Sequence, residues 1–446
     1  MRNACENPPM PVDAFTREVT RLALPAFGAL VAPSALLLTD TAFIGTLGTH
    51  AMAGYAGGAA AFGVATSLSY FLAYASTGVV ARRFGAGQHR EALADGIDHI
   101  ALGVVIGLVA AVLLWAGADV LTGWIGVQGE AHREAVAWLH GAALGAPAVM
   151  AAMAAVGLFR GLQDTRITLI VTVLQVALNI VLCAGAIFVL HLGTFGAGLA
   201  VAISETVGLL AYLLAIRSYA RTIGASMRPT HLRALGDAFT AGVPLLWRGF
   251  ALRTVLMGTT VVAARLGTRE LAAFQVSLNV WYVLSNLLDA LAIAAQAMVG
   301  RRLGASEGDG VQAVVRRLMR WALRYGIAVG ALVMVGAPWA PMLFSSNSTV
   351  QHLITVALLI VGAHQPLAAI VFLLDGVLVG SGDGRYLAFV LTMAMCTFLP
   401  IAWAVVHWNL GIVGLWCAMI AFLTTRAGLM VRRARSGAWI VEGATR

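Results

Sequence analysis

Four carboxylates lie inside long apolar segments of this sequence. Asp40, Glu205, Asp289 and Asp375 each fall in a run of residues long enough to cross a membrane. A charge at the middle of a bilayer costs about 2.5–3.5 kcal/mol on insertion scales, so an acidic residue there indicates a function or an internal ion pair. Such a carboxyl group can carry a proton or hold a cation.

The N-terminal half holds Asp40 and Glu205, and no Arg or Lys falls within its apolar segments. These two acids must then be protonated, meet a cation or face water. A buried carboxyl group holds its proton more tightly than one in water, as a proton-carrying site requires. We therefore expect Asp40 to have a functional role, with Glu205 as a further candidate.

The C-terminal half differs because basic residues accompany its acids. Arg248 and Arg253 fall inside an apolar segment of the half that holds Asp289 and Asp375, so the formal charges can cancel. We expect Arg248, Asp289 and Asp375 to form a polar network. An internal ion pair that holds helices together explains such a network as well as a function does.

Amide and aromatic side chains add to the N-terminal candidates. Gln175 and Asn179 lie one helical turn apart in an apolar run, where they could coordinate a ligand or join helices. Tyr55 and Tyr70 belong to an aromatic series along one segment. Packing is the simplest interpretation of that series, although a cavity for flat organic cations would use the same residues.

Several function classes are excluded by residue usage. All 29 basic residues are Arg, so a Walker A lysine or a Schiff-base lysine is absent. The four cysteines are scattered and predict neither a metal site nor a disulfide framework. We therefore expect no cofactor and no bound metal. The net charge of +9 could suggest nucleic acid, but in so apolar a chain it indicates membrane topology instead.

The elements that must position these residues are membrane-spanning helices. The chain has 446 residues, of which 60% are apolar and only 11% charged, and its mean hydropathy is +0.86. Backbone groups in lipid must be satisfied within the segment, so the fold is predicted to be all-α. About twelve spans are predicted, at roughly 22–44, 54–80, 96–118, 135–159, 167–190, 196–216, 238–264, 271–299, 322–343, 350–379, 386–407 and 412–431.

The arginines predict the orientation of these spans. With an even number of spans, 24 arginines fall on the side of the two termini, and Arg133, Arg265 and Arg269 fall on the other. Positive residues accumulate on the cytoplasmic side. We therefore expect a multi-pass protein of a bacterial-type inner membrane with both termini in the cytoplasm.

The chain repeats itself with an offset of 219 residues. Six spans precede the midpoint and six follow, so the two halves have the same orientation, as in many secondary transporters. The predicted organisation is a lobe at 1–216, a cytoplasmic linker at 217–236 and a second lobe at 237–446. The matched positions are Pro25 and Pro244, Pro147 and Pro366, Leu47-Gly48-Thr49 and Leu266-Gly267-Thr268, Arg82-Arg83-x-Gly85-Ala86 and Arg301-Arg302-x-Gly304-Ala305, and Gly157-x3-Gly161-x2-Asp164-x-Arg166 and Gly376-x3-Gly380-x2-Asp383-x-Arg385.

The repeat separates scaffold from function. Positions shared by both halves are expected to be structural, and Asp164 and Asp383 are expected to cap the helices that follow them. The four intramembrane acids have no acidic counterpart at this offset; Asp40, for example, falls on Thr259. The scaffold does not require them, so each has a local role.

The motifs resemble those of the multidrug and toxic compound extrusion (MATE) family, in its DinF-like branch. The resemblance covers nearly the whole chain. It rests on Pro25, Pro33 and Asp40-Thr41-Ala42-x2-Gly45-x-Leu47-Gly48, on Arg160-Gly161-Leu162-Gln163-Asp164-Thr165-Arg166, on Leu288-Asp289-Ala290 through Ala294-Ala295-Gln296-Ala297-x-Val299-Gly300, and on Leu374-Asp375-Gly376 through Gly382-Asp383.

The resemblance implies a fold and a set of roles. The fold would be twelve helices in two parallel six-helix repeats around a central cleft, and the activity would be export of organic substrates against an inward ion gradient. Asp40 matches the carboxylate that the family uses to bind the coupling ion, and Asn179 matches a polar residue near it. Two departures favour protons over sodium: Cys183 stands where relatives often carry a second acid, and Arg248 and Arg253 replace an acid of sodium-driven members.

The expected function is therefore a proton-coupled antiporter that exports organic, cationic compounds by alternating access. Its partners would be small organic substrates and the lipid bilayer, without nucleic acid, and the protein would be a monomer. The alternatives are a sodium-coupled exporter of the same family and a flippase for a lipid-linked substrate. An intramembrane enzyme would need a motif such as His-Glu-x-x-His, which the sequence lacks, or Gly-x-Ser-x-Gly within a span. The pattern Gly-x-Ser-x-Gly occurs only at Gly304-Ala305-Ser306-Glu307-Gly308, in a loop between two predicted spans.

Overall fold

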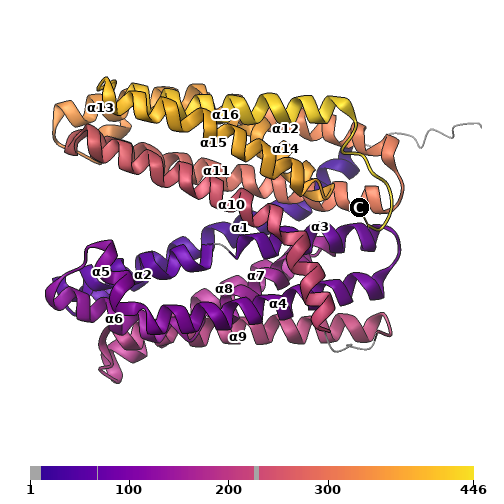
Figure 1. Ribbon diagram of the computed structural model, residues 1–446, viewed down its shortest axis with the longest axis horizontal. Coiled ribbons are helices and arrows are strands. Elements are labelled where there is room, and N and C mark those ends of the chain that lie inside the picture. The colour runs from indigo at the N-terminus through magenta and orange to yellow at the C-terminus, as the bar shows by residue number, and fades with distance from the viewer. Residues whose placement is uncertain (1–11, 68, 226–230, 446) are drawn as a thin grey trace, which may run out of the picture. The chain divides into compact units, whose positions relative to one another are not determined.

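The computed structural model describes residues 12–67, 69–225 and 231–445, and within them every regular element is a helix (Figure 1). Cys5 and Pro229 lie outside the described residues. The elements in chain order are α1 (Val12–Gly45), α2 (Thr49–Ser67), α3 (Tyr70–Gly85), α4 (His89–Ala116), α5 (Ala118–Ile125), α6 (Gly129–Ala143), α7 (Ala146–Gly161), α8 (Thr165–Ala184), the π-helix η1 (Gly185–Val189), α9 (Gly193–Thr222), α10 (Leu232–Leu266), α11 (Thr268–Gly304), α12 (Gly308–Gly336), the 3-10 helix η2 (Ala340–Leu343), α13 (Ser348–Ala363), α14 (Gln365–Gly380), α15 (Gly384–His407) and α16 (Gly411–Ser436).

The prediction of an all-α membrane protein is confirmed. Ten helical stretches of the described chain are long and apolar enough to cross a membrane, and two bent helix pairs raise the number to twelve. Each bent pair was predicted as a single span, at 135–159 and at 350–379. The sequence did not predict the short α5, and α9 continues to Thr222, inside the predicted linker.

The helices form two compact units. The N unit comprises Arg21–Val243, and the C unit comprises Pro244–Ala444 together with the first residues of α1 up to Thr20. The chain therefore passes from one unit to the other within α1 and within α10, close to Pro25 and at Pro244. The sequence had placed the lobes at 1–216 and 237–446, without assigning the start of α1 to the C-terminal lobe.

The start of α1 packs on α12 and α11 inside the C unit. The ring of Phe15 meets that of Trp321 edge-on with centroids 6.1 Å apart. The Arg317 guanidinium lies 4.9 Å above the Phe15 ring. Glu18 forms an ion pair with Arg301 at 3.8 Å. The first turns of α1 are thus held by aromatic and charged contacts of the C unit.

The sequence repeat reappears as repeated geometry within each unit. The pair α6–α7 bends by 52° and the pair α13–α14 by 51°. Pro147 and Pro366 each occupy the first turn of the second helix, where a missing N–H is tolerated. Gly157 lies against the Ala73 backbone and Gly376 against the Ala292 backbone, so close that neither has space for a Cβ. These repeated glycines are therefore helix contacts.

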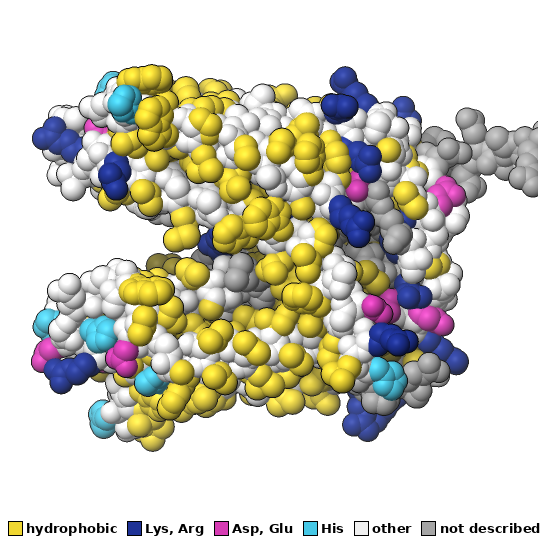
Figure 2. Space-filling model, in the orientation of Figure 1, with side chains coloured by type: hydrophobic (Ala, Val, Ile, Leu, Met, Phe, Trp, Pro, Cys, Tyr) yellow, Lys and Arg dark blue, Asp and Glu magenta, His cyan; other side chains and the backbone are white. Residues whose placement is uncertain are grey.

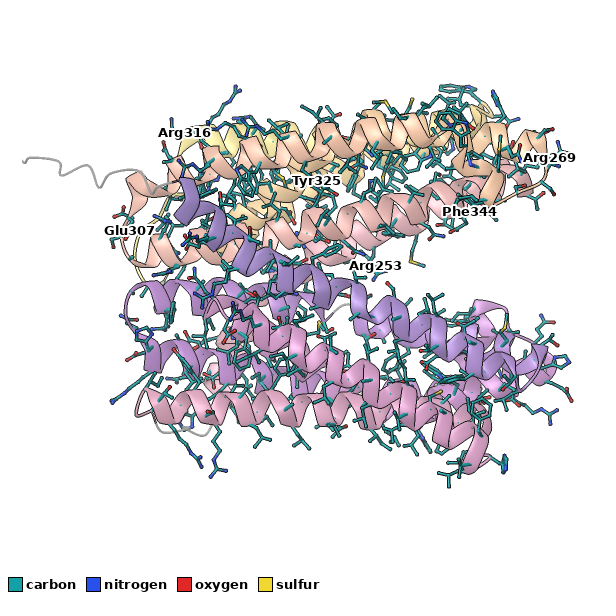
Figure 3. All side chains as sticks on the ribbon, turned by 180° about the vertical axis from the view of Figure 1, so that it is seen from behind. Arg253, Arg269, Glu307, Arg316, Tyr325 and Phe344 are labelled. Atoms are coloured by element: carbon teal, nitrogen blue, oxygen red, sulfur yellow. The ribbon has the colours of Figure 1, made fainter. Side chains whose placement is uncertain are left out.

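The helices of the C unit run between two opposite ends of that unit. In the C unit, Arg269 and Phe344 lie at one end, and Glu307 and Arg316 lie at the other (Figure 3). The C-terminal segment lies at the second of these ends, because Glu442 accepts a hydrogen bond from the Gly308 N–H at 2.8 Å. On the visible face of both units, hydrophobic side chains cover the middle and charged side chains gather toward the ends (Figure 2). This is the pattern of a membrane-spanning surface.

Candidate functional site

The carboxyl group of Asp40 lies in the interior of the N unit. Asp40 is on α1 and is only 3% exposed. Its neighbours Thr39 and Thr41 direct their hydroxyls to carbonyls of the preceding turn of α1 and so satisfy themselves within the helix. Asp40 has no such local arrangement and takes its partners from α8.

Two residues of α8 bind Asp40. The Cys183 side chain is hydrogen-bonded to the carboxyl group. In the amide orientation that satisfies both of its polar atoms, Asn179 donates from Nδ2 to Asp40 Oδ1 at 3.1 Å and accepts from the Val201 N–H at 3.2 Å. Asn179 is 1% exposed and lies 3.4 Å from Ser204 Oγ on α9. The amide therefore links three helices, and α8 approaches Asp40 with neutral groups.

The aromatic side of this site comes from α2 and α6. Tyr55 interacts electrostatically with Asp40, and a hydrogen bond joins its hydroxyl to the Thr41 side chain. The Tyr55 ring also meets Trp138 edge-on at 5.5 Å, and Phe62 meets the same indole at 5.9 Å. Tyr55 thus belongs both to the hydrophobic core of the N unit and to the surroundings of Asp40.

A second polar contact lies one turn along α8. Gln175 Nε2 donates to Glu205 Oε2 on α9 at 2.8 Å. Gly208 makes room for this pair, since a Cβ there would lie 2.2 Å from Gln175 Nε2. Tyr70, the remaining N-terminal candidate, is 50% exposed at the start of α3. The structure therefore brings Gln175 and Glu205 together and leaves Tyr70 outside these contacts.

The two acids within the spans of the N unit, Asp40 and Glu205, form no ion pair with a basic residue in the described part of the chain. Every hydrogen-bonding partner of Asp40 among the described residues is neutral. A neutral, buried setting lets a carboxyl group exchange a proton for a cation without an Arg competing for its charge.

The C unit shows the opposite arrangement. Asp375 on α14 lies between Arg248 on α10 and Arg426 on α16, and all three are buried. Arg248 donates from Nε to Asp375 Oδ1 at 3.3 Å and also from a terminal nitrogen to Oδ2. Arg426 donates to Asp375 Oδ1 at 3.5 Å. This cluster joins three helices through charge-assisted hydrogen bonds.

The other two charged candidates of this half lie on α11 and α10 and differ in exposure. Asp289 is half-buried on α11, and Arg253, labelled in Figure 3, is exposed on α10. The structure therefore brings together Arg248 and Asp375 of the predicted network.

Sequence reasoning missed Arg426 and Cys183. Arg426 was counted among the 24 arginines on the side of the termini, although it falls inside the predicted span 412–431. Its place in an apolar segment was the signal that could have identified it. Cys183 was noted only as a replacement for an acid, whereas its side chain binds Asp40. Nothing in the sequence indicated that contact, because Cys is a common residue of helix interiors.

The expected caps at Asp164 and Asp383 are not formed. Both residues precede a helix, but neither side chain bonds to the backbone of the first turn. Asp383 instead accepts a hydrogen bond from Arg433 Nε at 2.8 Å. A buried carboxylate gains more from a charged guanidinium than from a backbone N–H, and this explains the exchange of partner.

The described residues offer no cluster for a metal ion. Nowhere in the ranges given above do three His, Cys, Asp or Glu side chains come close enough together to hold one. Cys183, Cys396 and Cys417 are free thiols.

The sequence is similar to one protein family along most of its length. The MatE family model matches the chain twice, at residues 25–184 and 244–404. The chain is 28% identical to "Protein DETOXIFICATION 43" of Arabidopsis thaliana, over 95% of this chain and 91% of that protein. It is 27% identical to "DNA damage-inducible protein F" of Escherichia coli, over 94% and 92% of the two chains.

Solved structures share the fold. "Crystal structure of MATE in complex with MaD3S" has a TM-score of 0.82 at 19% identity and covers 95% of this chain and 97% of that chain. Relatives named NorM match over a similar length, so the matches do not assign one branch of the family. Because the two family matches together cover well over half of the sequence, the chain belongs to the MatE family of multidrug and toxic compound extrusion (MATE) transporters.

Proposed function

We propose that this transporter is an antiporter that exports organic, cationic compounds in exchange for protons. The observation that carries the proposal is the position of Asp40, which is buried in the N unit among neutral hydrogen-bonding partners. A carboxyl group in such a place alternates between two occupants, a proton and a cation. Exchange of one for the other is the elementary step of antiport.

Protonation of Asp40 removes its charge and weakens its hold on a cationic substrate. Transport also requires a helix that can rearrange, and α1 is suited to this role. In the most apolar 18-residue stretch of α1 only 11% of the residues are buried, compared with 67% in the corresponding stretch of α11. Pro25 and Pro33 each remove a hydrogen bond of the α1 ladder and provide bending points. In the proposed cycle, Asp40 takes up a proton from outside, and the substrate is released outward. Helix α1 then repacks, and the proton leaves Asp40 to the cytoplasm.

The ligands around Asp40 favour a proton over a sodium ion. A hard metal cation takes several oxygen ligands, usually including more than one carboxylate or carbonyl. Asp40 is accompanied by a thiol at Cys183 and by an amide that donates its N–H. A proton needs only one carboxyl oxygen, so this site suits it better. Sodium coupling is the principal alternative.

The arginine distribution supports an inner-membrane location with both termini in the cytoplasm. The end of the C unit that holds the C-terminal segment also holds Glu307 and Arg316, opposite to Arg269 (Figure 3). Positive residues accumulate on the cytoplasmic side, so this end is proposed to face the cytoplasm. We further propose that one chain is sufficient for transport, since the candidate residues all belong to it.

The test is transport in liposomes that contain the purified protein. A pH gradient and a sodium gradient are imposed separately, and the movement of a fluorescent organic cation is followed. Asp40→Asn removes the charge while keeping the shape. Asp119→Asn is the matched control, because the Asp119 side chain is 80% exposed.

The proposal expects uptake driven by the pH gradient, abolished in Asp40→Asn and retained in Asp119→Asn. Movement driven only by sodium would replace the proton with sodium. Undiminished transport by a folded Asp40→Asn protein would overturn the role of Asp40. Absence of cation movement under both gradients would favour the flippase alternative, and it would then be tested with a lipid-linked substrate.

A further inference from the structure

A pocket of about 420 Å³ lies within the C unit at its arginine-rich end. It is formed by the first turns of α15, the last turns of α16 and the segment that follows α16. No residue discussed above as a transport candidate lines it. Its lining residues are Tyr386, Phe389, Leu429, Arg432, Arg433, Ser436 and Ala438.

The walls of this pocket are fixed by hydrogen bonds between α15 and α16. The Tyr386 hydroxyl donates to the Leu429 carbonyl at 2.8 Å. Arg433 donates from Nε to Asp383 Oδ2 at 2.8 Å, and its guanidinium lies 4.9 Å above the Tyr386 ring. The charge of Arg433 is thus met by a carboxylate and an aromatic face. These contacts join the start of α15 to the end of α16 beside the pocket.

The segment after α16 closes the pocket on one side. Gly437 has φ of 68°, the left-handed conformation that ends a helix and reverses the chain. Trp439 is 1% exposed and donates from Nε1 to the Ala434 carbonyl at 3.1 Å. Further along, the Gly443 N–H donates to the Leu303 carbonyl at 3.0 Å. Ala438 is therefore part of an anchored segment.

Polar and apolar residues are arranged in order along the pocket. Arg432 and Ser436 are exposed near the end of α16, while Leu429 lies about one helical turn earlier, toward the middle of the span. On α15, Phe389 is 47% exposed and lies about one turn further from the helix start than Tyr386. Charge and hydroxyl therefore stand at the end of the unit, and apolar side chains stand deeper. This is the order of headgroup and acyl chain in a lipid.

We propose that this pocket binds the phosphate headgroup of an anionic lipid. Arg432 supplies the charge, because its neighbour Arg433 is already engaged by Asp383. Ser436 is a small side chain whose hydroxyl donates to the Arg433 carbonyl at 2.8 Å, and Phe389 and Leu429 accompany the upper part of the acyl chain. Basic pockets at the ends of membrane helices bind lipid headgroups through such arginines. The proposal does not depend on the proposed transport function.

The apolar depth of the pocket selects a lipid over a soluble phosphate. A free phosphate would gain nothing from Phe389 or Leu429, whereas a lipid would contact both. A lipid held here would also contact the anchored segment after α16, joining that segment to the bilayer. Binding is therefore expected to depend on Arg432 and on Phe389.

The test is native mass spectrometry of the full-length protein in detergent. The protein is delipidated and titrated with phosphatidylglycerol or with phosphatidylcholine of the same acyl chains. Arg432→Gln removes the charge from the pocket. Arg435→Gln is the matched control, because Arg435 is exposed on the same last turn of α16 but does not line the pocket.

The expected result is preferential binding of phosphatidylglycerol. Arg432→Gln should weaken this binding about tenfold, which is the size expected for one lost charged hydrogen bond. Arg435→Gln should leave it unchanged. Phe389→Ala should also weaken lipid binding. Equal binding of both lipids, or equal effects of the two arginine substitutions, would overturn the proposal. Binding of inorganic phosphate that Phe389→Ala leaves intact, together with no lipid preference, would make the pocket a site for soluble anions and would overturn it as well.

Discussion

The hydroxyl of Thr165 donates toward two adjacent carbonyls of α1, that of Leu22 at 3.1 Å and that of Arg21 at 3.3 Å. Arg21 is four residues before Pro25, which has no N–H to complete the helical hydrogen bond to that carbonyl. Thr165, at the start of α8, therefore satisfies the group that the proline leaves unpaired. The contact fixes α1 to α8 next to the point where α1 passes from the C unit to the N unit.

Thr165→Val should remove this hydroxyl while keeping the volume of the side chain. The part-buried Arg21 carbonyl then loses this donor, at a cost of about 0.5–1.5 kcal/mol in the free energy of unfolding. We expect a lower midpoint of thermal unfolding in detergent and slower transport, because α1 loses its anchor beside the bend. Thr165→Ser keeps the hydroxyl and should behave like the natural protein. Identical unfolding of the Val and Ser variants would show that the contact contributes nothing.

The contact between Thr165 and α1 is not repeated in the other half. At the offset of 219 residues, Pro25 corresponds to Pro244, but Thr165 corresponds to Gly384, which has no hydroxyl. Asp40 is unmatched in the same way, since it falls on Thr259. Asp40 and the contact of Thr165 with α1 are thus specific to the N-terminal repeat, as is Pro33, which falls on Leu252, while Pro25 and Pro244 are common to both.

The Arg248–Asp375–Arg426 cluster predicts which of its three single variants loses most free energy of unfolding. Asp375→Asn leaves two buried arginines without their shared carboxylate and should be the most damaging, at about 3–5 kcal/mol. Arg248→Met removes two hydrogen bonds to Asp375, and Arg426→Met removes one at 3.5 Å. The arginine variants should therefore follow in that order, because each leaves one arginine paired with Asp375.

Thermal unfolding of the three purified variants in detergent measures this order. A structural cluster also predicts that Arg426→Met retains transport once it is folded. If Arg426→Met were fully folded and yet inactive, the cluster would have a role in transport beyond joining helices. Equal stability of all three variants would show that the cluster does not stabilise the C unit.

The glycines shared by both repeats should tolerate no side chain. In Gly157→Ala the new Cβ would lie 2.4 Å from the Ala73 carbonyl oxygen, and in Gly376→Ala it would lie 2.3 Å from that of Ala292. Backbone atoms cannot move aside cheaply, so each variant should lose about 1–3 kcal/mol of stability. Gly249→Ala is the control, because a Cβ there meets nothing within 4 Å. Alanine is the better helix former, so this control should be as stable as the natural protein or more so. The three midpoints of thermal unfolding decide the prediction, and a loss in Gly249→Ala equal to the others would contradict it.

The sequence predicted the fold well because lipid leaves the backbone few options. Runs of apolar residues must be helices there, and the offset between Pro25 and Pro244 fixed the repeat. Asp40 and Glu205 could be identified for the same reason, since an acid without a basic residue nearby is conspicuous in an apolar run.

Contacts between helices were harder to predict. The bend between α6 and α7, the contact of Cys183 with Asp40 and the third member of the Asp375 cluster each depend on how helices face one another. Hydrophobic periodicity carries little of that information when helices are apolar on all sides. The pocket beside Arg432 is a further example, because it depends on where the segment after α16 folds back.

Glu205 provides the remaining prediction, because it is the second acid within a span of the N unit and its relation to Asp40 decides its role. Its carboxylate accepts a hydrogen bond from Gln175 at 2.8 Å, whereas the hydrogen bonds to Asp40 come from Asn179 and Cys183. The two acids thus have separate partners on α8. Glu205→Gln keeps an acceptor for Gln175 and removes only the charge. We therefore expect it to fold normally and to retain proton-driven transport at a reduced rate, whereas Asp40→Asn abolishes it.

Initial rates of cation uptake into liposomes, at matched protein content, compare the two variants. Gln175→Ala distinguishes the structural contribution, since it leaves Glu205 without this donor and should lower stability as well as rate. A Glu205→Gln protein that is well folded and as inactive as Asp40→Asn would show that both acids must carry the proton in turn. In that case the unit of coupling would be the pair of hydrogen-bonded contacts between α8 and its neighbours, rather than Asp40 by itself.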